Sequence, residues 1–189
     1  MRPGKSLAIL ILASLAVMSC KRGGDALDLS FFELEGPVRA VSWTGGVGLT
    51  SGQWDFSREG ALERGVWEVT GRDLHGRIRS ASYVEVDGDT REEFHATLEF
   101  TLDKDGAPVS AINRNDFGEY EYLFVRQADK LLGELSLRDL ADTVSYITGY
   151  HGYECDSLGN WTVRHYTVSC GGKVINSGTE CRDIVYYDE

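Results

Sequence analysis

From Phe31 onward, short runs of aromatic and β-branched residues alternate with polar ones. A period of two is typical of strands that bury one face of a sheet, and these residue types favour that conformation. The runs predict strands at Pro37–Trp43, Gln53–Phe56, Ala61–Val69, Arg77–Val86, Thr90–Leu102, Val109–Arg114, Glu119–Val125, Val144–Cys155, Trp161–Ser169 and Val174–Tyr187. Because the connections are short, consecutive strands should pair antiparallel as a meander.

Five of the connections share one turn pattern: a short polar side chain, two variable residues and a glycine. At the first position of a type I turn, Asp, Asn or Ser accepts hydrogen bonds from the backbone amides ahead of it. Glycine at the fourth position supplies the positive φ needed to re-enter a strand. The pairs that fit are Ser57/Gly60, Asp73/Gly76, Asp103/Gly106, Asn115/Gly118 and Asp156/Gly159. Their irregular spacing indicates a degenerate hairpin repeat with strands of variable length.

One stretch, residues 127–143, interrupts this pattern. Ser136 followed by Asp139, with leucines at 137 and 140, is typical of the start of a short helix. The leucines at 131 and 132 fit an irregular core segment equally well. We expect a short helix or a loop in this stretch.

The N-terminus resembles a bacterial lipoprotein signal. A positive n-region with Arg2 and Lys5 precedes Leu7–Val17, an apolar stretch that suits a signal-peptide core and is too short to span a bilayer as a helix. Val17, an aliphatic residue three places before Cys20, and Ser19, a small residue just before it, resemble a lipobox. Met18 departs from the small residue that is usual at the middle position between them. The other interpretation is an ordinary secretory signal with an incidental cysteine.

The lipobox interpretation divides the chain into three parts. We expect residues 1–19 to be a cleaved signal peptide and Cys20 to carry acyl chains such as palmitate, which together anchor stably where one chain would not. We expect residues 20–28 to form a flexible tether and residues 29–189 to form one domain of β-hairpin repeats. A lysine at position 21 favours the outer membrane, by analogy with the sorting of enterobacterial lipoproteins.

The charge of the mature chain narrows the classes of partner. The signal segment holds two of the nineteen basic residues and no acidic one, so the mature chain has a net charge of −13. Such acidity disfavours binding to nucleic acid and direct adsorption to anionic lipid.

The last turn carries a family resemblance. Asp156–Gly159 continues into Asn160 and Trp161 after a strand that contains tyrosines, and this D-x-x-G-N-W pattern resembles the YD (RHS-type) repeats of bacterial cell-surface proteins. The mature chain also resembles a group of small bacterial lipoproteins whose domain opens with L-x-G-x-V, here Leu34–Val38, and ends with a GNW repeat, a GK-V segment (Gly172–Val174) and a Tyr-rich end. The resemblance spans nearly the whole mature chain, is closest in its last third, and implies an all-β architecture.

With Cys20 assigned to lipid, three cysteines remain, and an odd number leaves at least one of them free. Cys155 and Cys181 flank the strand Trp161–Ser169, so they should lie two strand spacings, ~10 Å, apart, whereas a disulfide tolerates Cα separations up to ~7 Å. We therefore expect a possible disulfide to join Cys170 and Cys181, with Cys155 buried as a small apolar residue.

The turn at Asp156–Gly159 also predicts which residues face each other. The expected pairs on one face are His151/His165, Tyr153/Val163 and Cys155/Trp161. Two imidazoles could share a metal ion, and Cys155 beside His151 could form a nucleophilic pair. Zinc prefers three or four ligands, and a reactive thiol needs exposure and a base. We expect packing roles for these side chains, with no metal, no cofactor and no catalytic residue.

No nucleotide-binding loop, nucleophile elbow or HExxH motif is present. We expect an all-β domain with one meandering, twisted antiparallel sheet, either open or curled into a half-barrel, and at most one short helix. We expect the protein to be a membrane-anchored cell-envelope lipoprotein, a non-catalytic binding or structural module with a possible glycan or protein ligand. Tryptophans and tyrosines on the strands could form a stacking face for such a ligand, but a sheet that buries one face would place most of them in its core. One alternative is an envelope hydrolase that uses acidic residues in the concavity of the sheet. The other is an immunity or antitoxin-type partner of a secreted toxin, because an acidic surface suits a basic toxin.

Overall fold

The computed structural model describes residues 28–45, 52–86 and 90–188. They form one antiparallel sheet and a single turn of 3-10 helix. The elements are η1 (Leu29–Phe32), β1 (Val38–Thr44), β2 (Gly52–Phe56), β3 (Leu62–Arg64), β4 (Glu68–Arg72), β5 (Ile78–Val86), β6 (Glu93–Leu102), β7 (Pro108–Asn115), β8 (Gly118–Arg126), β9 (Leu132–Asp139), β10 (Ser145–Cys155), β11 (Trp161–Cys170) and β12 (Lys173–Tyr186). The predicted all-β meander is confirmed. Among the described residues, no helix is both long and apolar enough to cross a membrane.

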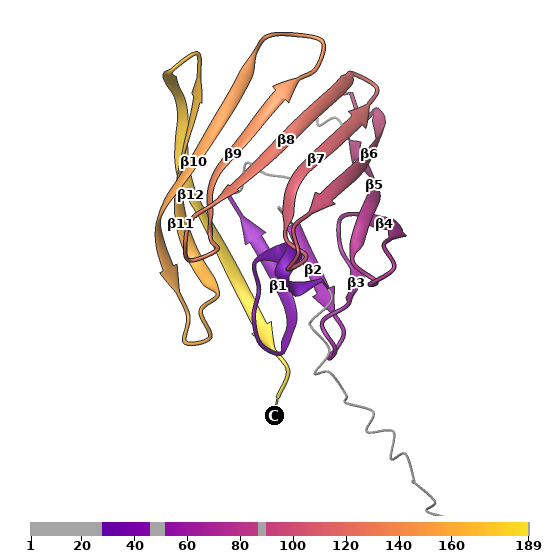
Figure 1. The fold of residues 1–189 in the computed structure, drawn as a ribbon, viewed down its shortest axis with the longest axis vertical. Helices are drawn as coiled ribbons and strands as arrows, with labels where there is room; N and C mark the ends of the chain where they lie inside the picture. Colours follow the sequence, from indigo (N-terminus) through magenta and orange to yellow (C-terminus); the bar gives the residue numbers. More distant parts are fainter. Residues whose placement is uncertain (1–27, 46–51, 87–89, 189) are drawn as a thin grey trace, which may run out of the picture.

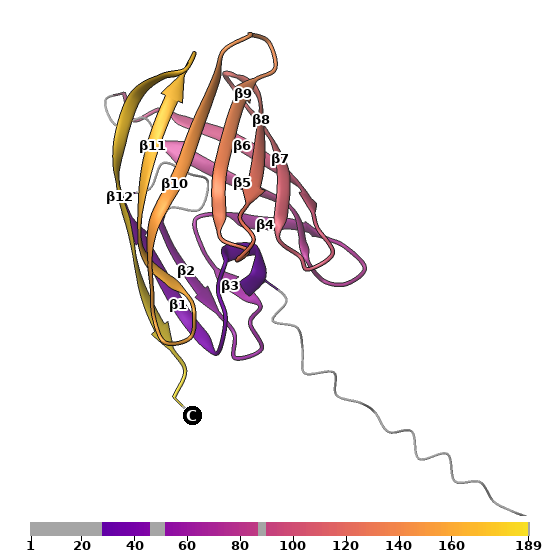
Figure 2. The ribbon, with the colours of Figure 1, turned by 60° about the vertical axis from the view of Figure 1, so that its left-hand side comes forward.

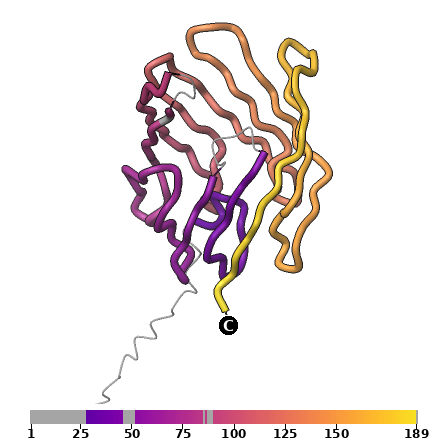
Figure 3. Tube along the Cα trace, turned by 180° about the vertical axis from the view of Figure 1, so that it is seen from behind, coloured from indigo at the N-terminus to yellow at the C-terminus, as the bar shows by residue number. Residues whose placement is uncertain are grey.

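The strand order explains the curvature of the sheet. The order is β3-β2-β1-β12-β11-β10-β9-β8-β7-β6-β5-β4, so the first three strands are added beside the last one. The two edges, β3 and β4, follow one another in the chain and have no backbone pairing in the described sheet. The sheet therefore curls into a nearly closed half-barrel (Figure 1 and Figure 3), and we call the junction of β3 and β4 the seam.

Five connections have the same backbone geometry. In each, the first residue donates its N–H to the carbonyl of the fifth, and the fourth donates to the carbonyl of the first, as in Asp73–Arg77, where both distances are 3.0 Å. The five loops are 57–61, 73–77, 103–107, 127–131 and 156–160. Because they join β2–β3, β4–β5, β6–β7, β8–β9 and β10–β11, they lie at the same end of the half-barrel, which we call the turn end.

Two turns differ from the sequence prediction. The loop 127–131 was not predicted because it begins with Gln127 and has Lys130, at φ 71°, where the other four have glycine. The predicted turn Asn115/Gly118 exists, but these two residues pair directly and enclose a two-residue loop. It joins β7 to β8 and therefore lies at the opposite, far end of the half-barrel.

The core lies at the turn end, where η1 fills the inside of the curved sheet (Figure 2). Phe31 and Phe32 are 4% and 1% exposed and contact the aromatic rings of Trp54, Trp67 and Phe100 at centroid distances of 4.8–6.2 Å. Burying a phenylalanine side chain stabilises a fold by roughly 1.5–3 kcal/mol. The short segment before β1 therefore supplies much of the core.

The prediction of a short helix or a loop in residues 127–143 holds only in part, because no helix forms and a strand occupies the middle of the segment. These residues form the loop 127–131 and β9, in which Leu135 is buried and pairs with Phe124 and Thr148. Backbone pairing with β8 on one side and β10 on the other outweighed the helix-capping signal of Ser136. The predicted single strand Ala61–Val69 is divided into β3 and β4 around Gly65, where a Cβ atom would lie 2.0 Å from the Trp54 ring.

Candidate functional site

The residue before η1 closes the seam. The Asp28 carboxylate is fully buried and accepts a hydrogen bond from the Leu62 N–H at 2.7 Å, on the β3 edge. From the β4 edge, the two guanidinium nitrogens of Arg72 donate to its two oxygens at 2.7 and 2.9 Å. The Asp28 N–H donates to the Gly60 carbonyl at 3.2 Å. A side chain from outside the sheet thus joins two strand edges that do not pair with each other.

A charged cluster lies inside the half-barrel beside η1. Glu33, which has φ 55° at the end of η1, lies 3.5 Å from Arg164 and 3.7 Å from Arg182, and accepts a hydrogen bond from the Trp161 indole at 3.1 Å. Glu180 accepts a hydrogen bond from the Arg164 Nε at 2.6 Å, and the same carboxylate oxygen lies 2.6 Å from the Arg164 Nη2 in an ion pair. Burial lowers the pKa of Arg182 well below its usual value, because the nearby carboxylates compensate only part of the lost hydration.

Aromatic rings cover the two buried guanidinium groups. Arg182 lies 3.6 Å from the ring centroid of Trp161 and 4.0 Å from that of Trp43. Arg164 lies 3.9 Å from the Tyr150 centroid and 4.2 Å from that of Trp161. Desolvated cation–π contacts of this kind contribute ~2 kcal/mol each. The cluster joins η1 to β1, β10, β11 and β12 and has the character of a structural centre.

The hairpin β10–β11 differs from the predicted register at a bulge. His151 faces His165 and Cys155 faces Trp161 as predicted, but Glu154, not Tyr153, faces Val163. Gly152 makes this possible with φ 63°. The bulge turns Tyr153 toward Arg164, whose Nη1 donates to the Tyr153 hydroxyl at 3.5 Å. The Tyr153 hydroxyl in turn donates to the Leu132 carbonyl. Burial raises the pKa of Tyr153 to about 12.

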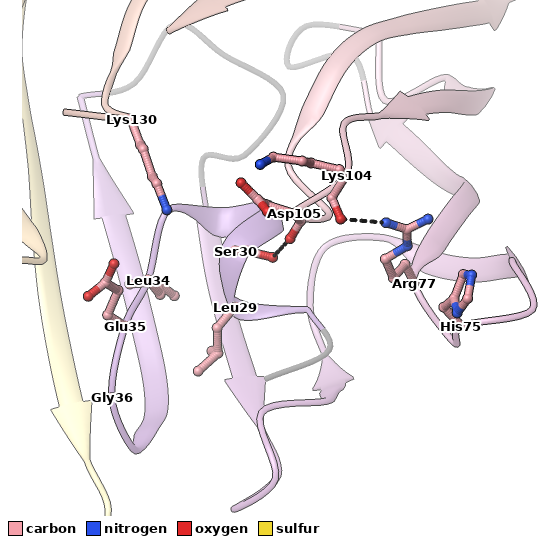
Figure 4. Close-up of a pocket in the computed structure, with 10 residues that line it drawn as sticks. All are labelled: Leu29, Ser30, Leu34, Glu35, Gly36, His75, Arg77, Lys104, Asp105 and Lys130. Carbon is pink, nitrogen blue, oxygen red and sulfur yellow. Dashed lines mark hydrogen bonds between the residues drawn. The ribbon is translucent and has the colours of Figure 1, made fainter. Parts of the chain in front are cut away.

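The turn end carries a pocket of about 810 Å³ (Figure 4). Leu29 and Leu34 form an apolar part of its lining, and charged side chains come from three of the turns. Its residues are Leu29, Ser30, Leu34, Glu35, Gly36, His75, Arg77, Lys104, Asp105 and Lys130. Arg77 is held by Asp73 at 2.8 Å and donates to the carbonyls of Asp103 and Lys104, and Ser30 donates to the Asp105 carbonyl at 3.0 Å. These bonds join η1 to two turns.

A second, smaller pocket of about 180 Å³ adjoins the first and shares Ser30, Leu34, Glu35, Asp105 and Lys130 with it. It adds the acidic residues Glu33, Asp103 and Asp129 and a single further basic residue, Arg126. The first pocket has more basic than acidic residues and the second more acidic than basic ones. The turn end therefore offers charges of both signs around an apolar floor.

Most of the predicted turn residues surround this region. Asp103, Gly159 and Asn160 line the smaller pocket, and Asp73 holds Arg77 in the larger one. The Asn160 amide accepts from the Glu35 N–H at 2.6 Å and donates to the Glu35 carbonyl at 2.9 Å. Trp161 is fully buried under the arginine pair. Gly76 and Gly106 have φ of 81° and 91° and complete their turns as predicted, whereas Asn115 and Gly118 lie at the far end.

The predicted disulfide is not formed. Cys155, Cys170 and Cys181 are free, and Cys155 is exposed rather than buried. Cys170 lies opposite Lys173 while Cys181 lies opposite Val163, seven residues away along β11. At ~3.3 Å per residue the two thiols are separated by about 23 Å, far beyond disulfide reach. Among the described residues no group of three His, Cys, Asp or Glu side chains is arranged to hold a metal.

Sequence reasoning missed the paired charges Asp28, Arg72, Glu33, Arg164 and Arg182. They are scattered along the chain and come together only when the sheet curls. The one local signal is Glu33, a charged residue that lies between the apolar pair Phe31–Phe32 and the apolar Leu34. The predicted signal segment, residues 1–19, and the predicted lipidation site Cys20 lie outside the described residues, as does the predicted tether up to residue 27.

Comparison with known proteins gives no relative from which a role could be transferred: no family model, no curated protein and no solved structure matches this chain.

Proposed function

We propose that this protein is a non-catalytic binding module of the cell envelope, held at a membrane by lipid on Cys20. The observation that carries the proposal is where the chain enters its domain. Asp28 is bound by Arg72 at the seam, and residues of η1 line the larger pocket. A lipid anchor at the N-terminus would therefore hold the turn end toward the bilayer. Residues 20–27 span at most about 28 Å when fully extended, which limits the distance between lipid and pocket.

The pocket chemistry supports a polar ligand, such as a glycan or a charged segment of a protein. Lys104, Lys130 and Glu35 are exposed residues of the pocket lining, close to the apolar side chains of Leu29 and Leu34. Sites of this composition orient a ligand with a few polar groups over an apolar floor. The buried carboxylates Glu33 and Glu180 are both engaged by arginines, which favours a binding module over the alternative of a hydrolase.

A protein partner at the far end is the second candidate, and it accommodates the immunity or antitoxin-type alternative. Phe117, Val174 and Ile175 are 66%, 66% and 56% exposed at the tips of two far-end hairpins. Exposed apolar side chains on an acidic protein suit a partner with a basic surface. Photo-crosslinking from position 117 in the native envelope distinguishes the candidates, because only this one gives a specific protein adduct there.

The test of the anchored module has two parts. Intact mass and detergent partitioning should give an acylated chain that begins at Cys20, and the Cys20→Ser variant should move to the aqueous phase. In vesicles that carry a headgroup quencher, a fluorophore at Lys104 should be quenched more than one at Lys173, at the far end. An unacylated mature chain would refute the anchor, and equal quenching at both positions would refute the orientation.

A further inference from the structure

The outer face of the hairpin β10–β11 carries two histidines in a direct cross-strand pair. His151 and His165 are register partners and both are exposed, with ring centroids 5.8 Å apart. Their neighbours Arg164 and Tyr166 on β11 are buried inside the half-barrel, so the histidines point outward. The pair therefore lies apart from the charged cluster and from the pockets at the turn end.

The separation of the rings fits a shared metal ion. Zinc lies ~2.1 Å from a ligating imidazole nitrogen and therefore about 3.2 Å from the ring centroid. Two imidazoles bound to one ion have centroids about 5.2 Å apart at a tetrahedral angle and about 6.4 Å apart in a linear arrangement. The observed 5.8 Å falls within this interval.

The surroundings of His165 hold its ring in the orientation that a ligand needs. Its Nδ1 and the Thr179 hydroxyl oxygen are 2.9 Å apart. When Nδ1–H donates to that oxygen, Nε2 is left with a free lone pair, the arrangement typical of metal-binding histidines. On the other side, a Cβ atom at Gly152 would lie 2.8 Å from the His165 ring, so only the glycine of the bulge lets the ring lie there.

The charge around the pair also favours a cation. Glu154 and Cys181 both face Val163, the outward residue one row from His165, and both are exposed. The mature chain is strongly acidic, which raises the local concentration of cations. Imidazole ligands select ions of the Zn²⁺ and Cu²⁺ class over Mg²⁺ and Ca²⁺, which prefer oxygen.

We propose that His151 and His165 form a surface site for one divalent transition-metal ion of the Zn²⁺ and Cu²⁺ class, with water completing the coordination. Sequence alone gave this pair a packing role, because it shows neither the outward direction nor the Thr179 contact. A bound ion would join β10 to β11 beside the bulge and stabilise the hairpin that covers the charged cluster.

Titration of the purified protein with Zn²⁺, followed by calorimetry, should show one saturable site. Substoichiometric Cu²⁺ should broaden the imidazole NMR signals of His151 and His165 before those of the other two histidines. His151→Gln should weaken Zn²⁺ binding at least tenfold, and Thr179→Val, which removes the partner of Nδ1, should weaken it about tenfold. His95→Gln is the matched control, because His95 is also exposed on an outer strand face but has no histidine opposite it.

Because protons compete with metal for imidazole, binding should also be lost in acid. The metal-free stability of each variant, measured alongside, separates loss of a ligand from loss of the fold. Absence of saturable Zn²⁺ binding would overturn the proposal. Unchanged affinity in His151→Gln, with the fold intact, would overturn it equally.

Discussion

Substitution of Asp28 by asparagine tests whether one side chain holds the seam closed. The change keeps the shape and leaves an amide oxygen to accept from the Leu62 N–H, but it removes the charge that the Arg72 guanidinium engages at 2.7 and 2.9 Å. Breaking a buried ion pair from one side costs about 3–5 kcal/mol. The Arg72 side chain is 32% exposed and can regain part of its hydration, so we expect a loss of roughly 2–3 kcal/mol in the free energy of unfolding.

Equilibrium unfolding in urea measures this loss. A double-mutant cycle with Arg72→Met gives the interaction energy between Asp28 and Arg72, because the second substitution should cost little once the first is made. For a domain of this size the melting temperature should fall by roughly 5–10 °C. Arg64→Met is the matched control: Arg64 pairs with Asp55 at 2.8 Å near the same seam but is 75% exposed, so its loss should cost less than ~1 kcal/mol. If Asp28→Asn lowers the free energy of unfolding by less than about 0.5 kcal/mol, with unchanged denaturant dependence, Asp28 does not hold the seam closed.

Three further predictions concern the interior and the bulge. Glu33→Gln removes the carboxylate that faces two buried arginines, so we expect a loss of about 3 kcal/mol in urea unfolding, and a neutral outcome would contradict the paired-charge account. Gly152→Ala should destabilise the fold by about 1–2 kcal/mol, because φ is 63° and the new methyl group meets the His165 ring. In the control Gly149→Ala, on the same strand, the new methyl group meets nothing within 4 Å, so the melting temperature should differ little from that of the wild type. Burial raises the pKa of Tyr153, and that of Tyr186, to about 12 in the folded state, so their contribution to stability is complete below pH ~10 and is lost as pH rises toward 12. Ultraviolet titration should show these tyrosines ionising later than exposed ones, and uniform ionisation near pH 10 would refute their burial.

The sequence by itself determined the local structure. Period-two alternation gave the strands, and Asp or Ser with glycine three residues later gave four of the five turns at the turn end, because these signals act within a few residues. Even the facing of His151 and His165 followed from the turn between them. The failures were also local: Ser136 suggested a cap that β9 overrode, and Lys130 took the place of a turn glycine.

Only the tertiary structure decided what lies inside the half-barrel. Glu33 meets Arg164 and Arg182 across more than 130 positions of sequence, and Asp28 joins the seam only because β1 pairs with β12 and curls the sheet. No local pattern encodes these contacts, since burial of a charge depends on which distant side chain arrives to compensate it. The same holds for the cysteines: Cys170 and Cys181 are close in sequence, but strand register places them about 23 Å apart.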